Sequence, residues 1–327
     1  MLSDFSYVYY LIFSVVKQGY NMLKYKHMMI KRTYKNITWI DLNRPTHEEI
    51  EQIVREYNIH PIVGENLLEP TLHPKVEEYR DHLYLVMHFP TINNTAFGSD
   101  QQEIDFVIGR DYLITAHYDI SDPLRNFSKQ FEVNSIIENN NMGNHPGFVF
   151  FYILKDLYSD MRAELQSLRA HTKSIEDVIF KGHNGKIVEE LSEISHKVLD
   201  YREATRFHKS LLVSFQATAT KMFGGDFTCY AETLLSEYYK LWELLETMRE
   251  TIVELKKTND SLLAFKTNEM IRFLTLFTFI ALPLQIIPDL FTTSVFVEGI
   301  YSPHVIHFSA LTVSLVLFLY FRFRKWI

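Results

Sequence analysis

The sequence predicts an α+β membrane protein with a cytosolic α/β domain, a long helical stalk and two C-terminal transmembrane helices. Three observations predict this class. Charged residues punctuate the first 270 residues, whereas two long apolar stretches close the chain. Strand-like alternation precedes residue 138, and helical periodicity follows residue 147. The 47% hydrophobic content and the net charge of −7 are typical of a folded chain and argue against a nucleic-acid partner.

Residues 1–34 are interpreted as an N-terminal extension. Its apolar stretch, 5–16, is too short to span a bilayer, and it lacks the positive charge and the cleavage site of a signal peptide. We expect a peripheral amphipathic or poorly ordered segment, with Met28 or Met29 as alternative start sites. A third membrane span is the alternative interpretation.

A cytosolic α/β domain is predicted over 35–138. Residues 36–42 form a strand, and 44–59 form a helix in which Thr46 and Glu49 make a capping box. Three further segments alternate like strands: 75–89, 101–109 and 112–118. The Asn- and Gly-rich stretch that follows the domain is a linker.

Helices are predicted throughout 147–269, the stalk. Glycines at 182–185 and 224–225 separate three helices, and no glycine or proline then interrupts the chain until Pro283. Seven apolar residues repeat at heptad spacing along the third helix: Leu234, Tyr238, Leu241, Leu245, Met248, Ile252 and Leu255. If this helix continues into the membrane, it is about 100 Å long at 1.5 Å per residue.

The end of the chain predicts a transmembrane hairpin over 270–327, with spans at about 270–292 and 304–321. A bilayer core requires roughly 20 apolar residues in a helix, with about 17 as the short limit. A buried core helix is the alternative for either stretch alone, but two such stretches in tandem favour a hairpin.

Basic residues flank the two spans at one membrane surface: Lys266 and Arg272 before the first, and Arg322, Arg324 and Lys325 after the second. The connecting loop carries Glu298 but no lysine or arginine. The positive-inside rule therefore predicts that both termini are cytoplasmic and that the loop faces outward.

Polar residues in the first span follow one stripe of the helix. Alternating steps of three and four from residue 268 select Asn268, Ile271, Thr275, Thr278, Leu282, Gln285, Asp289 and Thr292. Six of these eight are polar, whereas the seventeen positions off the stripe contain only Glu269 and Arg272 as polar residues.

A polar stripe in lipid is costly, at least ~2.5–3.5 kcal/mol for an aspartate near a helix centre. The second span has too few polar groups to cover it, so we expect copies of the chain to form a closed ring in which the stripes line a water-filled pore. The alternative is that Gln285 and Asp289 only join helices, while the threonines bond their own backbone.

Other chemistry has little support in the sequence. The single cysteine, Cys229, excludes an internal disulfide and a cysteine-rich zinc site. His304 and His307, three residues apart, are candidate metal ligands at the outer face, although interfacial histidines are commonly polar anchors. No phosphate loop, nucleophile elbow or HExxH motif is present, so we expect no enzyme.

Four segments carry a family resemblance: TWIDLNRPTHEEIEQIVREYNIHP, HPKVEEYRDHLYLVMH, TNEMIRFLTLFTFIALPL and the terminal FRKWI. They resemble the CorA metal-ion transporter family over residues 35–327. The resemblance implies a homopentamer around a central pore in the cell (inner) membrane. It also implies transport of a divalent cation, magnesium first, with Mg²⁺ as a possible regulatory ion and no organic cofactor. Zinc, cobalt or nickel transport is the alternative.

The resemblance carries over to particular residues. It aligns the pore-mouth asparagine of the family with Asn268, and its pore-lining positions with Ile271, Thr275, Thr278, Leu282 and Gln285. The Gly-Met-Asn motif of the outer mouth is absent. The residues expected there are Asp289, Thr292, Thr293, Ser294 and Glu298, with Asp289 and Asn268 as candidate cation contacts. A non-conducting regulatory homologue is therefore the other alternative.

Overall fold

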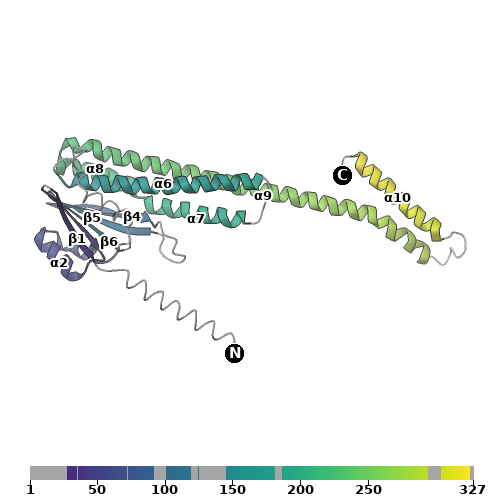
Figure 1. Ribbon diagram of the computed structural model, residues 1–327, viewed down its shortest axis with the longest axis horizontal. Coiled ribbons are helices and arrows are strands. Elements are labelled where there is room, and N and C mark those ends of the chain that lie inside the picture. The colour runs from purple at the N-terminus through teal and green to yellow at the C-terminus, as the bar shows by residue number, and fades with distance from the viewer. Residues whose placement is uncertain are drawn as a thin grey trace, which may run out of the picture. The chain divides into compact units, whose positions relative to one another are not determined.

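The computed structural model describes residues 28–34, 36–71, 73–91, 101–118, 124, 145–180, 186–293 and 303–324. The chain divides into two compact units, 1–252 and 253–327. The first unit holds a sheet and the helices that pack on it (Figure 1). The sequence suggested separate α/β and stalk domains. Within the first unit the sheet and most of the predicted stalk pack together, because helices from 147 onward contact the strands directly.

Six strands form one mixed sheet in the order β1-β2-β6-β5-β4-β3. They are β1 (Met28–Tyr34), β2 (Ile37–Asn43), β3 (Lys75–Glu78), β4 (Leu83–Pro90), β5 (Gln101–Ile108) and β6 (Tyr112–His117). β2 and β6 run parallel, and all other neighbours run antiparallel. The segment 75–89, expected to be one strand, forms β3 and β4, because the charged Arg80-Asp81 pair lies in a turn between them.

The sheet begins before the expected boundary at residue 35. β1 pairs with β2 along its full length, from Met28 opposite Asn43 to Tyr34 opposite Ile37. This pairing corrects the N-terminal extension of 1–34, because residues 28–34 add an edge strand to the sheet beside β2. Residues 1–27, with the apolar stretch 5–16, lie outside the described residues.

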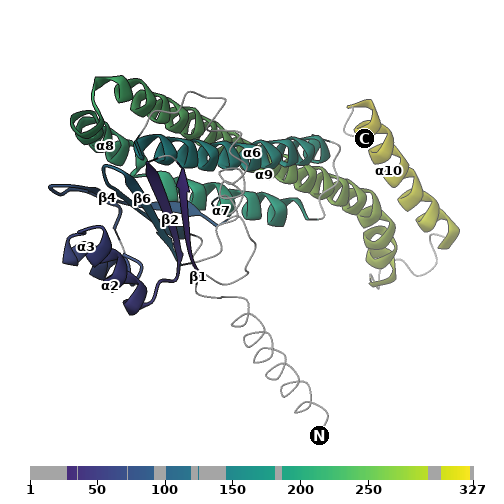
Figure 2. The same cartoon turned by 60° about the vertical axis from the view of Figure 1, so that its left-hand side comes forward.

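One face of the sheet is covered by α2 (His47–Glu56) and α3 (Pro61–Asn66), as Figure 2 shows. The predicted capping box is confirmed. The Thr46 hydroxyl accepts from the Glu49 amide at 3.3 Å, and the Glu49 carboxylate accepts from the Thr46 amide at 2.8 Å. α3 was not expected. It starts at Pro61, where a missing N–H costs no helical hydrogen bond.

The other face is covered by α6 (Gly147–Phe180), α7 (Ile187–Thr205) and α8 (His208–Phe223). We expected α7 and α8 to be one helix. The break lies at His208, the first residue of α8, which is fully buried and held by two contacts. Its Nε2 lies 2.8 Å from the His88 carbonyl oxygen in β4, and its Nδ1 lies 2.9 Å from the Tyr158 hydroxyl in α6.

Gly224 and a single 3₁₀ turn, η1 (Gly225–Phe227), separate α8 from α9 (Thr228–Thr293). Gly224 has φ of 91°, a conformation that favours glycine, so the predicted break is confirmed. The seven heptad residues are all buried, which confirms the predicted apolar seam: Leu234, Tyr238, Leu241, Leu245, Met248, Ile252 and Leu255.

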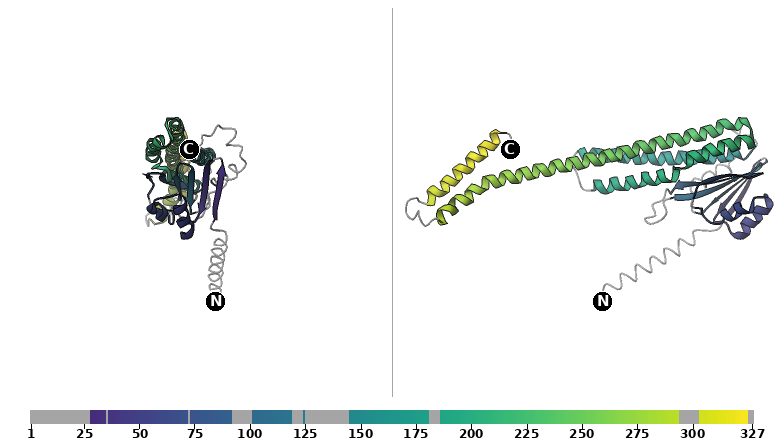
Figure 3. Two further views of the ribbon diagram at one scale, coloured as in Figure 1. Left: turned by 90° about the vertical axis from the view of Figure 1, so that its left-hand side faces the viewer. Right: turned by 180° about the vertical axis from the view of Figure 1, so that it is seen from behind.

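α9 is one continuous helix of 66 residues and includes both Pro283 and Pro288. It therefore extends from the first unit through the expected membrane span, about 100 Å at 1.5 Å per residue. α10 (Pro303–Phe323) follows within the second unit and returns antiparallel to the end of α9 (Figure 3). The segment from Gly225 to Asp289 is long and apolar enough to cross a membrane, and His307–Phe323 is a shorter apolar helix.

Candidate functional site

The polar stripe lies on an exposed side of α9. Seven of its eight residues have described side chains, and all seven are exposed: Asn268, Ile271, Thr275, Thr278, Leu282, Gln285 and Asp289. From Asn268 to Asp289 the stripe covers about 30 Å along the helix axis, the thickness of a bilayer hydrocarbon core. Among the described residues of one chain, these seven side chains are left exposed to the surrounding medium.

α10 packs on a different side of α9. Leu276 is only 5% exposed, and Ile280, Pro283 and Ile287 are half-buried at the same three-to-four spacing. At about 100° per residue, this row lies roughly 150° around the helix from the stripe.

The partner face of α10 is small and apolar. Ala310 and Ser314 are the buried residues of the described part of α10. The ring centroids of Phe321 in α10 and Phe279 in α9 lie 6.3 Å apart. α10 therefore covers an apolar side of α9 and leaves the polar stripe uncovered.

The stripe threonines satisfy their hydroxyl protons within the helix. The Thr275 hydroxyl donates to the Ile271 carbonyl at 2.7 Å, and the Thr278 hydroxyl donates to the Leu274 carbonyl at 2.9 Å. Each oxygen keeps lone pairs that can accept hydrogen bonds from outside the helix. These threonines need no partner on a neighbouring helix, and they present acceptors to whatever lies beside the stripe.

The residues expected at the outer mouth are only partly described. Asp289 lies in α9 and is exposed. Thr292 and Thr293 end the helix, but their side chains are not described, and Ser294 and Glu298 lie outside the described residues. Their role at an outer mouth stays a prediction.

His304 and His307 are exposed on the first turns of α10 and share one face at i, i+3 spacing. Within the described residues, no group of three or more His, Cys, Asp or Glu side chains could hold a metal ion.

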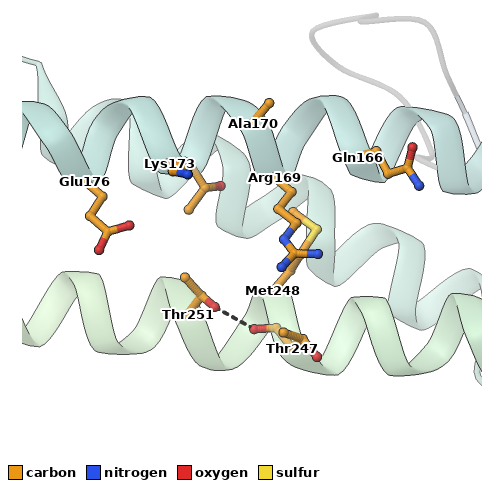
Figure 4. A pocket seen from close by; sticks show the side chains of 9 residues that line it. Gln166, Arg169, Ala170, Lys173, Glu176, Thr247, Met248 and Thr251 are labelled. Atoms are coloured by element: carbon orange, nitrogen blue, oxygen red, sulfur yellow. Dashed lines mark hydrogen bonds between the residues drawn. The ribbon is translucent and has the colours of Figure 1, made fainter.

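The first unit also contains a groove of ≈ 490 Å³ between α6 and α9, which we did not predict (Figure 4). Arg169 and Lys173 of α6 face Thr247, Met248 and Thr251 of α9 across it. No local pattern could have indicated this groove, because it arises from the packing of helices that are about eighty residues apart in sequence.

Comparison with known proteins identifies relatives along nearly the whole chain. Residues 34–325 match the family described as CorA-like Mg2+ transporter protein. The cobalt/magnesium transport protein CorA of Thermotoga maritima is 18% identical over 305 residues, which cover 89% of this chain and 83% of that protein.

Solved structures share the fold. The complete structure of the CorA magnesium transporter from Methanocaldococcus jannaschii has a TM-score of 0.76 at 17% identity, covering 90% of this chain and 94% of that chain. The structure of the full-length CmaX protein has a TM-score of 0.70 at 15% identity, covering 89% and 88%. With a family match over residues 34–325, the resemblance seen in the sequence is confirmed, and the chain belongs to the CorA-like Mg2+ transporter protein family.

Proposed function

We propose that this chain forms a homopentameric channel for hydrated divalent cations, magnesium first, with a pore lined by α9. One observation carries the proposal: the polar stripe is exposed on the side of α9 that α10 leaves uncovered. In lipid such a face is stable only against protein or water. Membership of a Mg²⁺ transporter family supports the choice of ion.

The chemistry of the stripe suits a hydrated cation. Magnesium keeps its water shell, and that shell offers hydrogen-bond donors to acceptors on a pore wall. The back-bonded Thr275 and Thr278 oxygens are such acceptors, and Asn268 and Gln285 add amide oxygens. Five Asp289 carboxylates at one level would form an acidic ring that attracts cations, in place of the absent Gly-Met-Asn motif.

The orientation follows from basic residues. Lys266 lies before the proposed first span and Arg272 lies in its first turn, and Arg322 and Arg324 lie at the end of the second span. The positive-inside rule supports cytoplasmic termini, with the Asp289 end of the stripe facing outward. The inner-membrane location is proposed from family membership.

Cysteine labelling tests the pore assignment. In a Cys229→Ser background, Thr275→Cys and Thr278→Cys should react with small water-soluble thiol reagents in liposomes. Phe279→Cys should not, because this position contacts Phe321 of α10. Equal labelling at all three positions would contradict a water-filled pore beside the stripe.

Flux in proteoliposomes distinguishes the remaining candidates. Magnesium influx that depends on the intact stripe supports the proposal. Zinc influx without magnesium influx, reduced when both His304 and His307 are replaced, would favour the zinc alternative, which the exposed histidine pair motivates. An assembled oligomer that passes no divalent cation would identify a non-conducting homologue.

A further inference from the structure

A second cavity lies at one end of the sheet in the first unit. The turn between β3 and β4 and the turn between β5 and β6 lie side by side there, because Leu83 pairs with Ile108. The last two turns of α8 close a space of ≈ 380 Å³ against them. Its lining residues are Glu78, Tyr79, Arg80, His82, Leu83, Arg110, Thr218, Lys221 and Met222.

The lining carries an excess of positive charge. Arg80, Arg110 and Lys221 come from three different elements, whereas Glu78 is the only acidic residue of the lining. The Lys221 Nζ lies 3.5 Å from the Glu78 carboxylate, and the Arg110 guanidinium lies 3.6 Å from the Asp81 carboxylate. Both basic side chains are largely exposed, and both carboxylates are about half exposed. Such surface pairs are weak and are easily exchanged for a better anion. Arg80 makes no ion pair with the described part of the chain.

His82 adds an unused hydrogen-bonding group. It is only 3% exposed, and both of its ring nitrogens are buried without a hydrogen-bond partner. The His82 ring stacks on the Tyr79 ring, with 4.9 Å between the two ring centroids. Burial, and then the charge of His60, lower the pKa of His82, which favours the neutral ring with one N–H donor. A buried donor without an acceptor is unusual in a native structure.

These groups together match a phosphate group. A carboxylate is satisfied by the fork of a single arginine, whereas a phosphate has three or four oxygens and accepts from several donors on different sides. We propose that this cavity binds a phosphate group, carried by inorganic phosphate or by a soluble phosphomonoester, through Arg80, Arg110, Lys221 and the N–H of His82. The site is independent of the pore and lies in the unit that precedes it.

Calorimetric titration of the full-length protein in detergent tests the site. Inorganic phosphate at low salt should bind saturably, with one site per chain. Arg80→Gln and Arg110→Gln should each weaken binding about tenfold or more, since each removes charge-assisted hydrogen bonds. The matched control is Arg169→Gln, which removes an exposed arginine from the groove between α6 and α9 (Figure 4) and should leave binding unchanged.

A second titration with adenosine monophosphate distinguishes an organic phosphate from the free ion as the ligand. Affinity at least tenfold above that of inorganic phosphate assigns the site to an organic phosphate, and equal affinity assigns it to the free ion. No saturable binding of either probe, or binding that Arg80→Gln and Arg169→Gln reduce equally, would overturn the proposal.

His82→Phe separates binding from folding. Phenylalanine keeps the stack on Tyr79 and removes the unpaired nitrogens, so the variant should unfold at the same or a higher temperature than the parent without phosphate. The upward shift of the unfolding temperature on adding phosphate should become smaller. An undiminished shift would remove His82 from the site.

Discussion

Asp289 is the last residue of the polar stripe whose side chain is described. Removing its charge tests whether the stripe lines a cation pore. Asp289→Asn keeps the size of the side chain and removes the charge. Because a ring of carboxylates concentrates cations at a pore mouth, the variant should lower divalent flux about tenfold at low salt. Its flux should also depend less on ionic strength than that of the parent. Flux at two salt concentrations, measured in proteoliposomes, checks both effects.

The control for this prediction is Glu269→Gln, which removes a charge from the same helix off the stripe and should change flux little. If Asp289 only joins helices, Asp289→Asn should loosen the oligomer while conduction per intact assembly stays the same. Measuring oligomer mass and flux on one preparation separates these outcomes, and unchanged flux from an intact oligomer ends the proposal for Asp289.

His208 makes the first unit sensitive to acid. Complete burial is the main cause that lowers its pKa to about 4, whereas the unfolded chain has a histidine pKa of about 6.5. Between these values the unfolded state binds the additional proton, so the free energy of unfolding falls as pH falls. The slope from this residue approaches ~1.4 kcal/mol per pH unit, and its effect is absent above pH 6.5.

His208→Gln can keep both hydrogen bonds, to the His88 carbonyl and from the Tyr158 hydroxyl, and cannot titrate. Urea unfolding at several pH values should therefore show a smaller loss of stability between pH 6.5 and 4 than in the parent. The control is His171→Gln, which replaces an exposed histidine on α6. An equal pH slope in the parent and in His208→Gln would mean that other groups cause the acid sensitivity.

Among helices and strands, the sequence predicts those features that are determined by residues close together in the chain. The capping box at Thr46 needs only Glu49 three residues on, and the buried seam of α9 follows from a heptad repeat. The continuity of α9 as far as Pro283 is also a local property, because no glycine or proline lies between Gly225 and that residue.

Elements that depend on distant partners escaped prediction. β1 is stabilised by its pairing with β2, whose other edge pairs with β6. α8 is separated from α7 where His208 is held by His88, 120 residues earlier in the chain. The cavity beside Arg80 and Lys221 forms where two turns and the end of a helix lie together in the fold. Residue spacing in the sequence does not predict this arrangement.

The same distinction applies to the stripe. The exposure of the stripe on one side of α9 agrees with its helical spacing. That α10 packs on another side of α9 could not be predicted from this spacing.

For the whole molecule, the exposed stripe predicts an oligomer. Beside the stripe, the described part of one chain offers only the shorter apolar helix α10, and α10 packs elsewhere on α9. Copies must therefore shield the polar groups, and a closed ring in which all stripes face the axis does this with one repeated contact. Family membership supports five copies. Native mass spectrometry of the detergent-solubilised protein should give one species of five times the chain mass.

Cross-linking tests the direction in which the stripes face. In a Cys229→Ser background, Thr275→Cys should form disulfide-linked dimers under mild oxidation, because neighbouring copies bring residue 275 together around the axis. Leu284→Cys is the matched control. Leu284 is 45% exposed and lies on another side of α9, so it should face lipid and remain monomeric. Covalent dimers through position 284 but not through position 275 would show that the oligomer hides its apolar side, and the pore assignment would then be wrong.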